Sequence, residues 1–68
     1  MPFRDVKGFD ADTLRNMTHA FNAACDRLGL GPEDPQRAEL AAEIIELAAR
    51  GERDPGMLFS LAVQALDD

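Results

Sequence analysis

The fold is decided by the stretch Asp34-Pro35-Gln36-Arg37-Ala38-Glu39-Leu40-Ala41-Ala42-Glu43-Ile44-Ile45-Glu46-Leu47-Ala48-Ala49-Arg50-Gly51. Asp34 can cap a helix N-terminus, and Pro35 suits the first helical position, where its missing N–H costs nothing. Gly51 suits the left-handed residue that follows a last turn, and Arg50 places a positive charge near the negative end of the helix dipole. The stretch therefore predicts a helix over residues 34–50.

This predicted helix is apolar around more than half of its circumference, over about 220° at 100° per residue. Leu40, Ile44 and Leu47 form one ridge, and Ile45 stands well away from it. The remaining apolar positions are alanines 38, 41, 42, 48 and 49, which let neighbouring helices approach closely. One neighbour cannot cover so wide an arc. The helix is therefore predicted to be the middle element of a small bundle, packed on two sides.

A first helix is predicted over residues 10–28. Asp10 is a suitable N-cap, and Phe9 and Leu14 have the spacing of a hydrophobic staple. Gly29 and Leu30 have the pattern of a Schellman ending. Six residues in steps of three and four form the inner face, Leu14, Met17, Phe21, Ala24, Cys25 and Leu28, while Arg15, His19, Asn22 and Asp26 lie opposite.

A third helix is predicted over residues 54–66, because Asp54-Pro55 repeats the capping pattern of Asp34-Pro35. Its expected inner face is Leu58, Leu61, Ala62, Ala65 and Leu66. Residues 1–9 lack helical periodicity and predict an extended arm. The predicted fold is all-α, a compact three-helix bundle over residues 10–68 with an extended N-terminal arm.

Composition restricts the function. The 68 residues allow one domain, with one cysteine and a net charge of −6. The charge argues against nucleic acid and against an anionic membrane surface, since both need Lys and Arg. No apolar run has the length of a signal peptide or a membrane span. A cytoplasmic protein is predicted, and the lone thiol suits a reducing compartment.

Candidates for chemistry have simpler structural interpretations. His19 could accept a phosphoryl group, but it fits a solvated helix face. Cys25 lies on the inner face and predicts an inert buried thiol. Glu39, Glu43 and Glu46 form an outward acidic stripe without the Glu-x-x-His motif of bundle metal sites. No catalytic residue, cofactor or metal site is therefore predicted.

Two known protein classes were compared at the level of motifs. Acyl carrier proteins bear their prosthetic group on the serine of an Asp-Ser-Leu motif at a helix start, whereas Ser60 follows Leu58-Phe59 inside a predicted helix. A helix-turn-helix regulator has the right size and is kept as the alternative. Its recognition helix should present basic and amide side chains at its N-terminal end, where the third helix has Asp54, Pro55, Gly56 and Met57.

A wider pattern runs from Phe9-Asp10 through Leu28-Gly29, Asp34-Pro35 and Gly51-Glu52 to Asp54-Pro55. It resembles that of small uncharacterised bacterial helical proteins over residues 9–66. The shared elements are caps and core positions, so the resemblance implies no activity, cofactor or site.

The predicted function is a small, acidic, non-enzymatic interaction or regulatory module. The third helix is apolar over about 240° at 100° per residue, which two short neighbours cannot hide. Met57, Phe59 and Val63 are the predicted interface residues, and a homodimer or another protein is the predicted partner.

Overall fold

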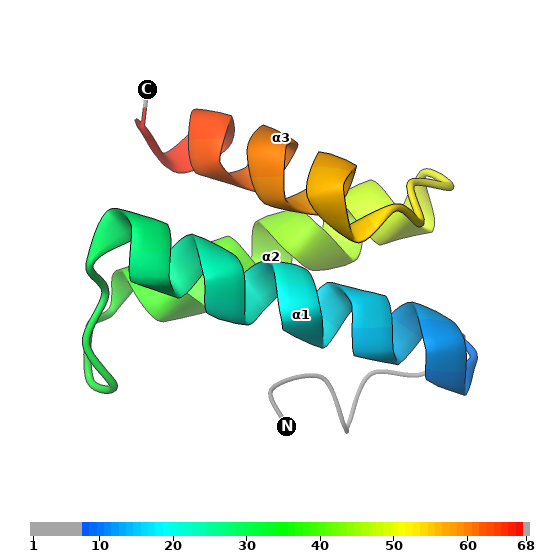
Figure 1. The fold of residues 1–68 in the computed structure, drawn as a ribbon, viewed down its shortest axis with the longest axis horizontal. Coiled ribbons are helices and arrows are strands. Elements are labelled where there is room, and N and C mark those ends of the chain that lie inside the picture. Colours follow the sequence, from blue (N-terminus) through cyan, green and yellow to red (C-terminus); the bar gives the residue numbers. More distant parts are fainter. Residues whose placement is uncertain (1–7, 68) are drawn as a thin grey trace.

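A computed structural model describes residues 8–67 of the chain as three helices, α1 (Ala11–Leu28), α2 (Gln36–Ala49) and α3 (Pro55–Asp67), each packed against the other two (Figure 1). The predicted all-α three-helix fold is confirmed, with helix bounds within two residues of those expected. The predicted arm falls mostly on residues 1–7, which lie outside the described residues. Phe9, at its end, is half-buried and packs against the core with Leu14, as the staple spacing predicts.

Side-chain and backbone groups satisfy both ends of α1. The Asp10 carboxylate accepts a hydrogen bond from the Thr13 N–H at 2.8 Å. At the other end, Gly29 has a left-handed φ of 69°, and the Leu30 N–H donates to the Cys25 carbonyl at 2.9 Å. Leu30 is buried, so it closes the predicted Schellman ending with an apolar contact.

Asp54 caps α3 as predicted, whereas the N-cap of α2 is Pro35 and Asp34 lies one residue before it. Asp34 Oδ1 accepts from the Gln36 N–H at 2.9 Å, and Asp54 Oδ2 accepts from the Met57 N–H at 3.0 Å. Pro35 already has helical dihedrals, although regular α2 begins one residue later. Gly51, with a φ of 105°, ends α2 as Gly29 ends α1. The capping residues therefore fix where two of the three helices end.

The core lies between the three helices and is apolar apart from Thr13 at its edge. It consists of Met17, Ala20, Phe21, Ala24, Cys25, Leu30, Leu40, Ile44, Leu47, Ala48, Leu58 and Ala62. Leu40, Ile44 and Leu47 are the predicted ridge of α2. Ala20 is a core residue that the predicted inner face of α1 omits.

The predicted packing of α2 on two sides is confirmed, because α2 contacts both α1 and α3. The helix is not a middle element, since α1 and α3 also contact each other. Its outer alanines Ala38, Ala42 and Ala49 are exposed, and only Ala48 is fully buried. The broad apolar arc reflects alanine at surface positions, where a good helix former needs no neighbour. On α3, Ala65 was expected to point inward and is exposed for the same reason.

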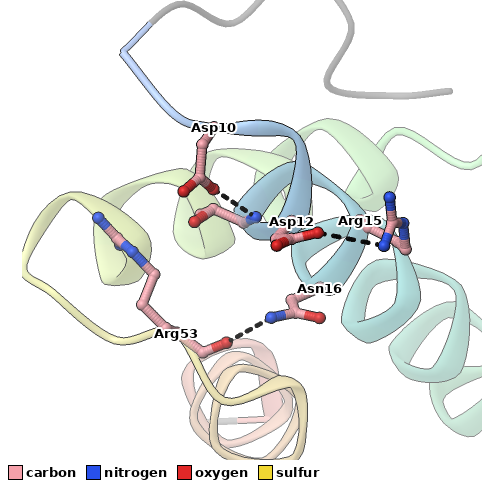
Figure 2. Close-up of polar contacts among 6 residues, drawn as sticks. Asp10, Asp12, Arg15, Asn16 and Arg53 are labelled. Atoms are coloured by element: carbon pink, nitrogen blue, oxygen red, sulfur yellow. Dashed lines mark hydrogen bonds and ion pairs between the residues drawn. The ribbon is translucent and has the colours of Figure 1, made fainter.

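The loop between α2 and α3 is attached to the start of α1. The Asn16 side-chain amide donates to the Arg53 carbonyl at 3.1 Å, across 37 residues of sequence (Figure 2). The Arg53 guanidinium lies 5.5 Å from the centre of the Phe9 ring and donates to the Ala48 carbonyl. These contacts hold α3 in its orientation across α1.

Candidate functional site

The outer surface of α3 differs from the other two helices because its exposed residues between Gly56 and Leu66 carry no charge. From Gly56 to Leu66 the sequence has no Asp, Glu, Lys or Arg, in a chain in which these make up 29% of residues. Met57, Ser60 and Gln64 are exposed at successive steps of three and four, so they lie along one line on the helix. We call these three residues the α3 stripe. Asp67 continues the same line at the end of the helix.

Met57, Phe59 and Val63, the predicted interface residues, do not form one patch. Met57 is 46% exposed, whereas Phe59 and Val63 are half-buried and pack against the core. At 100° per residue, Met57 and Phe59 point about 160° apart around α3. The exposed part of the surface instead includes Ser60 and Gln64, which the apolar criterion misses. The signal that identifies them is their spacing relative to Met57, combined with the absence of charge.

Two half-buried apolar residues flank the α3 stripe. Leu61 lies on one side, about 67° from the centre of the stripe, and Val63 on the other, about 93° from it, at 100° per residue. Both pack against the core with part of their surface and leave the remainder accessible. The outer surface of α3 therefore combines a neutral, largely polar line with an apolar edge on either side.

The outer face of α1 is charged. Its exposed residues include Asp12, Arg15, His19, Asp26 and Arg27. Arg15 and Asp12 form an ion pair at 3.2 Å (Figure 2), and both side chains are largely exposed. Such an exposed pair contributes little to stability, about 0.2–1 kcal/mol. This face therefore has the character of an ordinary solvated surface.

A groove of about 460 Å³ runs along α1. On its described side it is lined by Ala11, Leu14, Arg15, Thr18, His19 and Asn22. Thr18 donates its hydroxyl to the Leu14 carbonyl at 2.9 Å, which turns the polar atom toward its own helix. The groove is consequently mostly apolar. Its described wall comes from one helix, whereas ligand sites bring together polar groups from several elements.

The acidic residues of α2 face outward as predicted. Glu39 and Glu46 are exposed and Glu43 is half-buried. Glu46 is paired with Arg50 at 2.6 Å, the predicted contact between residues four apart. Among the described residues, no three His, Cys, Asp or Glu side chains are placed to hold one metal ion. The three glutamates of α2 thus have the geometry of a solvated helix face.

The three residues that could act as a nucleophile or base, Cys25, His19 and Ser60, do not contact one another. Cys25 is a buried free thiol, and burial raises its pKa although Arg37 acts in the opposite direction. A thiol in this state stays protonated at neutral pH and is a poor nucleophile. His19 is exposed on the outer face of α1, and Ser60 is exposed in the middle of α3. No pair among them has the contact that nucleophilic catalysis needs.

Three arginines of the described chain make contacts within the protein. The Arg37 guanidinium, near the start of α2, lies 5.1 Å from the centre of the Phe21 ring. Arg50 is paired with Glu46, and Arg53 lies over Phe9. These three cations therefore do not present the row of free phosphate contacts that a groove-binding helix uses.

Two further searches bear on function, one for membrane-spanning helices and one for similar proteins. In the described part of the chain, no helix has the length and apolarity to cross a bilayer. Comparisons with protein-family models, curated proteins and solved structures gave no match. Function is therefore inferred from the surface itself.

Proposed function

We propose that this protein is a non-enzymatic interaction module that self-associates through the outer surface of α3. One observation carries the proposal: the α3 stripe and its edges are uncharged in a chain of net charge −6. A module of this kind would act in the cytoplasm, where a reducing environment suits the lone buried thiol of Cys25.

Electrostatics favours this surface over the others. Two copies of an acidic protein repel each other, and the repulsion is strongest where their charged faces meet. The outer faces of α1 and α2 carry Asp12, Asp26, Glu39 and Glu46 as exposed acids. The α3 surface avoids this cost. The centres of protein interfaces are depleted in charge and enriched in methionine, which matches Met57 on α3.

The size of the surface limits the affinity. The length of α3 is about 20 Å for its 13 residues at 1.5 Å per residue. A contact one helix wide buries less than the roughly 1,600 Å² of a standard interface. We therefore propose a weak, reversible dimer with a dissociation constant in the micromolar range, which suits a regulatory role better than a permanent assembly.

Sedimentation velocity across a concentration series tests the proposal. The wild-type chain is expected to shift from monomer to dimer at high micromolar concentration. Gln64→Glu places a charge on the α3 stripe and should weaken the dimer at least about tenfold, equivalent to 1.4 kcal/mol. Asn22→Asp makes the same amide-to-acid change on the charged outer face of α1, where Asn22 is exposed, and should leave the dimer constant unchanged.

Each result has a defined consequence. A wild-type chain that stays monomeric at high micromolar concentration overturns self-association. Equal weakening by both variants would show that net charge, and not the α3 surface, governs the association. A dimer that Gln64→Glu leaves intact would place the interface on another face.

A further inference from the structure

We draw no further inference here: the strongest candidate, the mostly apolar groove along α1, has a described wall from that helix alone, and nothing in the described part of the chain shows what occupies it.

Discussion

Helices α1 and α3 pack against each other more extensively than any other pair, yet they differ on the side that faces away from the contact. The inner faces are alike: Met17 on α1 and Leu58 on α3 are both completely buried. The outer face of α1 has acidic and basic residues in alternation, whereas α3 is neutral from Gly56 to Leu66. The two helices thus meet the same packing requirement with different surfaces.

The comparison shows that folding constrains the inner face of each helix and leaves the outer face free to vary. Burial constrains the inner face of each helix, because every buried methylene contributes to a marginal stability. No such constraint acts on the outer face, where charged residues serve solubility. A helix that gives up charge on its outer face gives up solubility there. The neutral face of α3 is therefore the surface on which the proposed self-association rests.

The largest expected effect tests whether the inner faces are truly equivalent. Met17→Ala and Leu58→Ala each remove a fully buried side chain. Each should lower the free energy of unfolding by about 2–5 kcal/mol, since a cavity is left in a close-packed core. Urea titration followed by circular dichroism measures the change. Met57→Ala, at a residue 46% exposed, is the control and should cost less than about 1 kcal/mol.

A Leu58→Ala variant that is as stable as wild type would contradict the equivalence. It would mean that α3 is only loosely attached to the pair formed by α1 and α2.

The second test compares helix endings. Gly29 has a φ of 69°, and nothing lies within 4 Å of the position that a Cβ would occupy. Gly29→Ala should therefore cost about 1–2 kcal/mol from backbone conformation alone. Gly31→Ala is the matched control, because its position is equally open and its φ is outside the left-handed region. Thermal unfolding of both variants should show a loss only for Gly29→Ala.

The third test concerns the charged residue in the last turn of a helix, which is positive in α1 and negative in α3. Arg27 lies in the last turn of α1 and Asp67 in the last turn of α3. Asp67→Lys should raise the free energy of unfolding by about 0.3–1 kcal/mol, and Arg27→Glu should lower it by a similar amount. Urea titrations at a protein concentration well below the proposed dissociation constant measure both. Changes of the same sign would exclude the helix dipole as their cause.

The smallest effect is a pH dependence at the start of α1. Hydrogen bonds from the Thr13 side chain and N–H hold the pKa of Asp10 below its usual 3.8, with a smaller contribution from Arg53. Because the folded-state pKa is the lower one, the stabilisation is present above about pH 3.8 and is lost as the pH falls through the folded-state value. The stability gap between wild type and Asp10→Ala should therefore narrow in acid.

An NMR titration of the Asp10 carboxyl checks the cause. Thr13→Val removes the hydroxyl but keeps the backbone N–H, so the Asp10 pKa should rise toward its usual value without fully reaching it. A pKa identical to that of wild type would mean that the hydroxyl is not involved.

Caps and inner faces could be predicted from the sequence because each depends on a few neighbouring residues. Asp10 begins α1, and Gly29 and Gly51 end α1 and α2, each through its own backbone or a contact within one turn. The outward alanines of α2 could not be placed in the same way, because alanine suits both a close helix contact and an exposed helix surface. The predicted interface residues differ in burial, which spacing alone did not indicate: Met57 is exposed, whereas Phe59 packs partly against the core.

The attachment of the α2–α3 loop to α1 could not be predicted from the sequence either. Nothing local links Asn16 to Arg53, which are 37 residues apart. Their contact depends on how the three helices cross, and the crossing follows from the packing of all the core residues together. A polar contact between distant residues can therefore be identified only once the fold is known.

This contact has a consequence for hydrogen exchange. Helix termini normally exchange their amide protons through fraying, each end independently of the others. Here the second turn of α1 and the loop before α3 meet at Asn16 and Arg53, with the Phe9 ring beneath the guanidinium. Opening either segment removes a partner of the other. The amides around Asn16 and those at the start of α3 should therefore exchange together as one cooperative unit, although they belong to opposite halves of the chain.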